Sequence, residues 1–131
     1  MANEAGIEYT LDDVAEIYKK TPYIADLKPG GQYVAKDMAE AGGMPILMRT
    51  MLDGGYLHGD CMTVTGKTIA ENLEDITFRP DQKVIYPVTT PISPTGGVVG
   101  LKGTLAQDGA IVKVAGLAIL SFRGPRGARG I

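Results

Sequence analysis

The residues that most suggest a chemical function, phosphate binding, are Gly66-Lys67-Thr68, because they match the last three positions of a phosphate-binding loop. Such a loop reads G-x-x-x-x-G-K-[ST], so that its backbone N–H groups can curl around phosphate oxygens. Its first glycine would have to stand where the sequence has Cys61, and the nearest glycine, Gly59, comes too early. We interpret the segment as a turn into a helix, with Thr65 or Thr68 as N-cap and a capping box ending at Glu71.

The only cysteine, Cys61, and the only histidine, His58, lie close together in the sequence. One thiol cannot by itself hold zinc or an iron–sulfur cluster, because those sites use several ligands. A Cys–His nucleophilic pair is defined by proximity in space, so it stays open as a minor alternative, although neither residue lies in a known cysteine-nucleophile motif. The sequence therefore predicts no catalytic, cofactor-binding or metal-binding residue in this chain.

The composition excludes several classes of protein. With 44% hydrophobic and 21% charged residues, the 131 residues have the balance of one ordinary soluble domain. The net charge of −2 gives no footprint for nucleic acid, and Arg123, Arg126 and Arg129 are interpreted as a solvated terminus. Without a signal peptide or a membrane-length apolar run, and with one cysteine, we expect a cytoplasmic protein with no nucleic-acid or membrane partner.

The residues before about position 75 have helical periodicity. Thr10–Asp13 has capping-box spacing, and the helix that follows should end at Thr21-Pro22, because the residue before proline disfavours helical backbone. Tyr23–Leu27 is predicted as a short strand. Two further helices are predicted at Tyr33–Ala41, closed by glycines, and from Pro45 to Leu52.

After position 75 the pattern changes to short β runs separated by proline and glycine. Asp108-Gly109 between two apolar runs predicts a hairpin in which Gly97–Leu105 lies antiparallel to Ala110–Ala115. Further strands are predicted at Val84–Tyr86 and Leu117–Phe122. The fold class is therefore α+β, a helical half followed by part of a small β-barrel.

Five segments carry a resemblance to a known family. The chain resembles dihydroxy-acid dehydratases, in order and spacing, from about Glu4 to Gly124. The wider family also includes sugar-acid dehydratases and phosphogluconate dehydratase, and the Gly-Asp-Cys-x-Thr-Val-Thr-Gly-Lys-Thr stretch is most similar to the branch in branched-chain amino-acid biosynthesis. The segments are Ala25–Val34 (ADLKPGGQYV), Glu40–Gly43 (EAGG), Leu57–Leu73 (LHGDCMTVTGKTIAENL), Pro91-Ile92, and Leu101–Lys113 (LKGTLAQDGAIVK).

The resemblance implies a division of the chain. Members of the family are several times longer, with an α/β N-terminal domain followed by a swivelling β-barrel domain. It implies that this chain is an internal fragment: residues 1–75 the helical end of the first domain, 76–82 a linker, and 83–131 the incomplete start of the barrel. At the end the chain departs from the family, which continues Gly-Pro-Ala-Arg-Val-Phe where this sequence has Gly124-Pro125 followed by Arg126-Gly127.

The resemblance also implies an activity for the full-length parent. Such enzymes remove water from a 2,3-dihydroxy acid to give a 2-keto acid, using an iron–sulfur cluster and Mg²⁺. The family's cluster cysteines and metal-binding lysine match nothing here, nor does the serine proposed as base, and Cys61 corresponds to a non-ligand cysteine. We therefore expect no cofactor in this chain, no activity in isolation, and a dihydroxy-acid substrate for the parent only. Because the predicted strands are too few to close a barrel and leave an edge open, we also expect a homo-oligomer.

Three alternatives remain beside this interpretation. The chain could be a stand-alone swivelling-domain module that binds a ligand or subunit without catalysis. It could be a fragment of a sugar-acid dehydratase. A nucleotide-binding protein is the third, and it rests only on Gly66-Lys67-Thr68.

Overall fold

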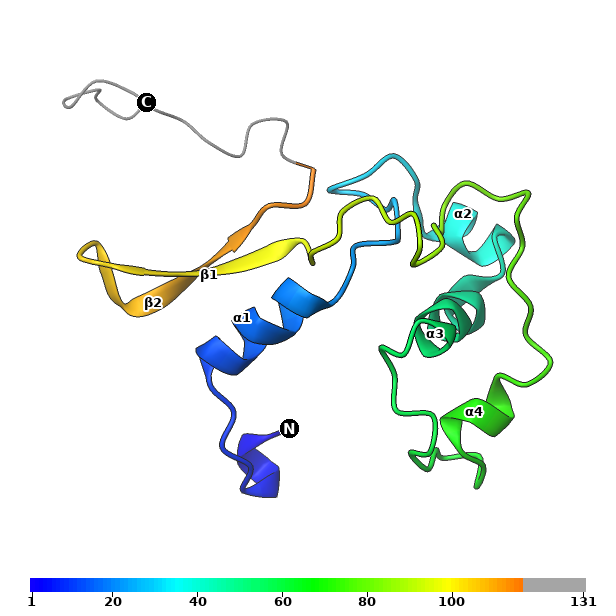
Figure 1. The fold of residues 1–131 in the computed structure, drawn as a ribbon, viewed down its shortest axis with the longest axis horizontal. Helices are drawn as coiled ribbons and strands as arrows, with labels where there is room; N and C mark the ends of the chain where they lie inside the picture. The colour runs from blue at the N-terminus through cyan, green and yellow to red at the C-terminus, as the bar shows by residue number, and fades with distance from the viewer. Residues whose placement is uncertain (117–131) are drawn as a thin grey trace.

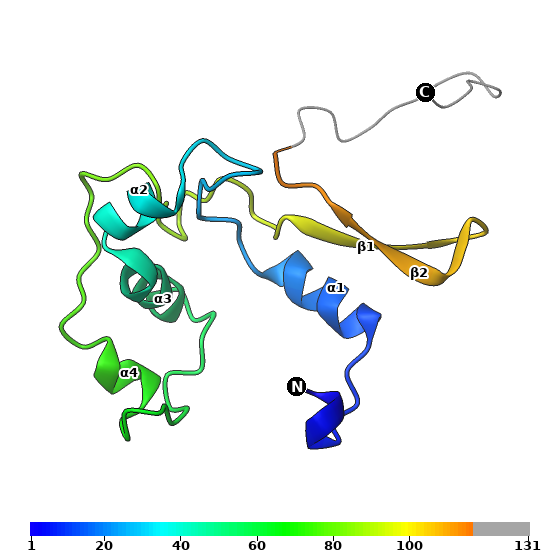
Figure 2. The same ribbon diagram turned by 180° about the vertical axis from the view of Figure 1, so that it is seen from behind.

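The computed structural model describes residues 1–116, which form a helical part followed by a two-stranded antiparallel sheet. The α+β class is thereby confirmed. In Figures 1 and 2, α1 lies alongside the hairpin, while α2, α3 and α4 gather at the other end of the molecule. The strand predicted at Leu117–Phe122 and the three arginines after it lie outside the described residues. In order, the elements are a 3-10 turn at Asn3–Ala5, α1 (Leu11–Lys20), α2 (Ala35–Glu40), α3 (Gly43–Asp53), α4 (Ile69–Asn72), β1 (Val98–Gly103) and β2 (Ala106–Lys113).

Helix α1 begins and ends as its sequence predicts. The Asp13 amide donates to Thr10 Oγ1 (3.3 Å), and the Thr10 amide donates to Asp13 Oδ2 (2.8 Å), which completes a capping box. Thr10 Oγ1 also donates to Asp13 Oδ2 (2.7 Å), and this bond, followed by the one from the Thr10 amide, holds the pKa of the Asp13 carboxyl below its ordinary value. At the other end Thr21 Oγ1 donates to the Ile17 carbonyl (2.8 Å) immediately before Pro22. Local capping chemistry is thus sufficient to define this helix.

The segment predicted as a strand at Tyr23–Leu27 is extended, but it pairs only through isolated bridges. Tyr23 pairs with Ser93 and Ala25 with Ile85, and the Tyr86 amide donates to the Ile24 carbonyl (2.8 Å). Pro87, near Ile85, and Pro91 and Pro94, on either side of Ser93, lack the backbone N–H groups that a longer ladder of hydrogen bonds would need. These bridges join residues 23–27 to residues 84–93.

The core is small and is shared between the two halves of the sequence. Its most buried member is Ile85, which is 1% exposed. Val84 and Ile85, from the region predicted to start the barrel, pack against residues from the helical half. Within the described residues, the halves therefore share a core instead of each having its own. The buried cluster comprises Ile24, Met38, Ala41, Ile46, Val84 and Ile85.

The hairpin is antiparallel as predicted, but its predicted turn is wrong. Leu101 pairs with Ala110 and Gly103 with Ala106, so the chain reverses between Gly103 and Ala106, and Asp108-Gly109 lies inside β2. Gly109 has φ +93°, at a register irregularity where β2 has more residues than β1 between these pairs. The left-handed conformation that Asp-Gly favours is used for a bulge instead of a turn.

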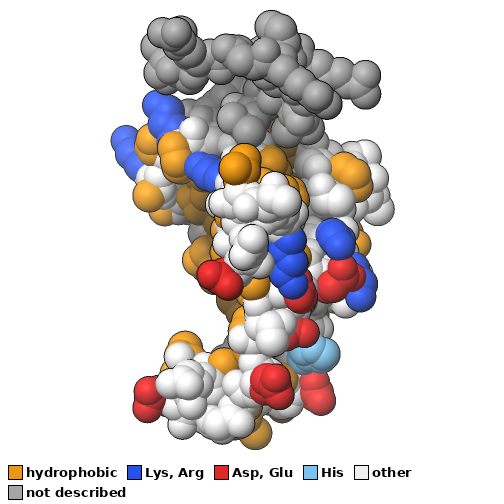
Figure 3. Space-filling view, turned by 90° about the vertical axis from the view of Figure 1, so that its left-hand side faces the viewer, with side chains coloured by type: hydrophobic (Ala, Val, Ile, Leu, Met, Phe, Trp, Pro, Cys, Tyr) orange, Lys and Arg blue, Asp and Glu red, His pale blue; other side chains and the backbone are white. Residues whose placement is uncertain are grey.

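One face of the hairpin is covered by α1. A Cβ on Gly100 would lie 3.0 Å from the Ala15 side chain, and Lys102 Nζ forms an ion pair with Asp12 Oδ2 (2.6 Å). Val99, Leu101 and Val112 remain between 37% and 47% exposed. Figure 3, seen from the hairpin side, shows hydrophobic side chains at the surface beside positively charged ones. The described residues contain only this two-stranded sheet, so the β-barrel remains a prediction.

Candidate functional site

The segment around Gly66-Lys67-Thr68 is a turn leading into α4, as predicted. Thr68 is the N-cap: its Oγ1 accepts from the Glu71 amide (3.2 Å), and Glu71 Oε2 accepts from the Thr68 amide (2.6 Å). The backbone hydrogen bond from Thr68, followed by its side-chain hydrogen bond, lowers the pKa of the Glu71 carboxyl. A carboxylate therefore occupies the end of the helix where a phosphate loop would bind its anion, which argues against nucleotide binding.

The same turn is closed by a network of uncharged side chains. Thr63 Oγ1 donates to the Lys67 carbonyl (2.8 Å) and accepts from Asn72 Nδ2 (2.9 Å). Thr65 Oγ1 donates to Asn72 Oδ1 (2.9 Å). Gly66 supplies the positive φ (+77°) that the reversal requires. The polar residues of this motif therefore build the turn itself.

Cys61 and His58 are both exposed and lie in the loop before this turn. The Cys61 amide donates to the His58 carbonyl (3.3 Å), but in residues 1–116 no hydrogen bond joins the two side chains. No group of three or more His, Cys, Asp or Glu side chains in that range is arranged to hold a metal ion. Within residues 1–116, Cys61 and His58 therefore lack the side-chain hydrogen bond that is typical of a nucleophile and its general base. That this chain has no site residues stays a prediction.

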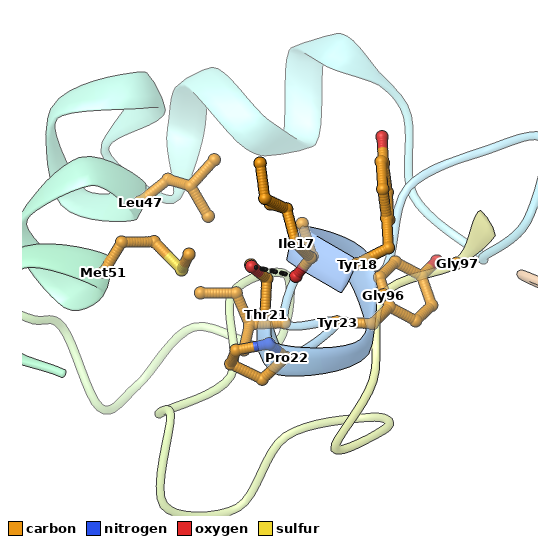
Figure 4. Close-up of a pocket in the computed structure, with 11 residues that line it drawn as sticks. Ile17, Tyr18, Thr21, Pro22, Tyr23, Leu47, Met51, Gly96 and Gly97 are labelled. Atoms are coloured by element: carbon orange, nitrogen blue, oxygen red, sulfur yellow. Dashed lines mark hydrogen bonds between the residues drawn. The ribbon is translucent and has the colours of Figure 1, made fainter. Parts of the chain in front are cut away.

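A largely apolar cavity of about 420 Å³ lies between the end of α1 and helix α3 (Figure 4). Ile17, Leu47 and Met51 contribute to its walls, and the Thr21 hydroxyl, one of its few polar groups, is already bonded to the Ile17 carbonyl. Burial raises the pKa of the Tyr23 phenol, and the Asp26 carboxylate adds to the rise. The cavity can hold an apolar group but offers no side chain suited to proton transfer near neutral pH.

A second cavity, of about 520 Å³, has a buried carboxylate in its lining. Asp26 is 9% exposed, and its Oδ1 accepts from the Gln32 amide (3.1 Å) while its Oδ2 accepts from Gln32 Nε2 (3.3 Å). Sequence reasoning missed this residue. The contact between Asp26 and Gln32 could have been predicted, because Lys28-Pro29-Gly30-Gly31 between them has the composition of a turn that brings the two residues together.

No helix within residues 1–116 combines the length and the apolar character needed to cross a bilayer. The longest, α3, has 11 residues. A bilayer core requires roughly 20.

Comparison with known proteins identifies two family models that match the chain in succession. The model described as Dihydroxy-acid/6-phosphogluconate dehydratase N-terminal matches residues 1–72, and the corresponding C-terminal model matches residues 83–129. The chain is 65% identical over 127 residues to the dihydroxy-acid dehydratase of Parvibaculum lavamentivorans. It is 66% identical over 125 residues to dihydroxy-acid dehydratase 2 of Bradyrhizobium diazoefficiens, and 49% identical over 126 residues to the dihydroxy-acid dehydratase of Saccharolobus islandicus.

Each of these alignments covers 95% of this chain but only 22–23% of the relative. The chain thus spans about a fifth of the length of the curated relatives it matches.

Proposed function

The chain belongs to the dihydroxy-acid/6-phosphogluconate dehydratase family, and we propose that it is a segment of a hydro-lyase that converts 2,3-dihydroxy carboxylic acids to 2-keto acids. The observation that carries the proposal is identity of 65% over 95% of the chain to a dihydroxy-acid dehydratase. The relatives named above are dihydroxy-acid dehydratases, which favours a dihydroxy acid over 6-phosphogluconate or a sugar acid. Branched-chain amino-acid biosynthesis, in the cytoplasm, is the corresponding pathway.

The proposed reaction removes a proton from C2 and the hydroxyl from C3 of the substrate, and the resulting enol tautomerises to the 2-keto acid. A bound iron–sulfur cluster with Mg²⁺ would supply Lewis-acid polarisation of the departing hydroxyl. The donors of residues 1–116 do not fit such a group, because the chain has one thiol and the described residues hold no cluster of metal-ligating side chains. We therefore assign the cluster and the cation to parts of the full-length enzyme other than residues 1–116 of this chain.

The role of this segment is to join two domains. Residues 1–75 are the end of the first domain, 76–82 the linker and 83–131 the start of the swivelling barrel. The gap between the two family matches supports this boundary. The contact of α1 with β1, and the bridges from residues 23–27 to 84–93, hold the two sides of the linker together.

The isolated chain should have neither dehydratase activity nor a bound cluster. Anaerobic reconstitution with iron and sulfide, followed by visible absorbance and a 2-keto-acid assay, tests this expectation. The full-length Parvibaculum lavamentivorans enzyme serves as the positive control. A stoichiometric cluster on the 131-residue chain, or turnover by it, would contradict the proposal.

A further inference from the structure

The cavity around Asp26 contains a buried charge with no charged partner among residues 1–116. Asp26 is only 9% exposed, and each ion pair found in that range is formed by other residues. Burying a carboxylate is costly unless a cation or several hydrogen bonds compensate it. Gln32 supplies two hydrogen bonds from uncharged groups.

The carboxylate retains unused acceptor capacity. A carboxylate has about four lone-pair sites, and Gln32 occupies one on each oxygen. One site therefore remains on Oδ1 and one on Oδ2, the arrangement that a planar guanidinium satisfies with two parallel N–H donors. Gly31 leaves room for the carboxylate, because a Cβ there would collide with Asp26 Oδ1.

The walls of the cavity add a second feature that suits a cation. Tyr33, Phe78 and Tyr86 all contribute to the lining. Aromatic faces attract a guanidinium through the ring quadrupole. Lys83 also lines the cavity and works against a cation. About 520 Å³ is within the size range of small-ligand pockets.

We propose that the Asp26 cavity is a guanidinium-binding site. The guanidinium pairs with the Asp26 carboxylate and lies against the aromatic walls. Its source is either a free arginine-like molecule or an arginine side chain on a protein segment. The proposal concerns binding by this chain alone, so its failure would leave the dehydratase assignment untouched.

The probe is N-acetyl-arginine methylamide, and its matched control is the citrulline analogue, which has the same shape without the charge. Binding is followed by ¹H–¹⁵N NMR of the full 131-residue chain, at the Gln32 backbone and side-chain amides. The expected result is a saturable shift with the arginine compound and binding at least tenfold weaker with citrulline. Tighter binding of the same arginine within a short glycine-flanked peptide would identify a protein segment as the source, whereas equal affinity would identify a free ligand.

Three variants separate binding from folding. Asp26→Asn keeps an oxygen for the Gln32 amide and should weaken binding at least tenfold. Tyr86→Leu leaves the backbone bond to Ile24 intact and should weaken it several-fold, whereas Lys83→Gln should strengthen it by removing a competing cation. The proposal is overturned if citrulline binds equally well, if folded Asp26→Asn binds like the parent chain, or if no saturable shift occurs at tens of millimolar. If Asp26→Asn does not fold, unchanged affinity in both other variants overturns it.

Discussion

Replacing Ile85 by valine tests whether the two sides of the proposed linker share one core. Ile85 is 1% exposed and packs with Ile24, Met38 and Ile46, all from the first half of the sequence. The substitution removes one methyl group and keeps the β-branched shape that suits extended backbone. No hydrogen bond is lost, so the effect on stability reports packing alone.

The expected loss follows from burial. Removing one buried methyl group costs about 0.8 kcal/mol in transfer free energy, and the cavity left behind raises the total to about 1–1.5 kcal/mol. The matched control is Ile111→Val, because Ile111 lies in β2 and is 55% exposed. A surface change of this kind should alter the free energy of unfolding by less than about 0.5 kcal/mol.

The assay is urea unfolding followed by far-UV circular dichroism at several chain concentrations. Ile85→Val should lower the midpoint without changing the slope of free energy against urea, since the surface exposed on unfolding is nearly the same. Equal losses for Ile85→Val and Ile111→Val would refute the shared core. The absence of a cooperative unfolding transition in the unmodified 131-residue chain would also refute the shared core.

Three further predictions concern the caps, the phosphate-loop motif and the open face of the hairpin. The capping hydrogen bonds lower the pKa values of the Asp13 and Glu71 carboxyls. Their contribution to stability is therefore present above the unfolded-state pKa and is lost as the pH falls through the folded-state pKa. The double variant Asp13→Asn, Glu71→Gln should make the melting temperature less dependent on pH below about 4.5. Lys67→Ala should leave the melting temperature almost unchanged, and ATP should not raise it, whereas saturating ligand would stabilise a true site by roughly 2–4 kcal/mol; an ATP shift that Lys67→Ala abolishes would contradict this. The apolar side chains exposed on the hairpin, and the strand edges that have no partner within residues 1–116, should drive self-association, which Leu101→Lys should reduce in sedimentation experiments. A monodisperse wild-type chain that binds no hydrophobic dye at low micromolar concentration would favour a self-contained module.

The features predicted correctly from sequence are those decided within a few residues. The capping boxes that begin α1 and α4 each depend on a threonine and a carboxylate three residues later. Pro22 ends α1 for an equally local reason. The turn from Gly66 into α4, with Thr68 as its N-cap, was predicted from the same local pattern.

The features missed depend on contacts between distant residues. Asp108-Gly109 suits both a turn and a bulge, and the sequence alone does not distinguish them. The observed register is accompanied by packing of α1 on β1, including the ion pair between Lys102 and Asp12, which are 90 residues apart. The Asp26 cavity was missed for a similar reason, because its lining combines residues 26–33 with residues 78–87.

The most direct test of the dehydratase assignment is a chimera. The segment of the Parvibaculum lavamentivorans enzyme that aligns with this chain is replaced by this sequence, and formation of 2-keto acid from a branched 2,3-dihydroxy acid is measured after cluster reconstitution. The intact parent enzyme is the positive control, and a chimera carrying the same segment in scrambled order is the negative control. The account predicts substantial activity, because about two thirds of the exchanged residues are identical. A folded, cluster-loaded chimera without activity would contradict it.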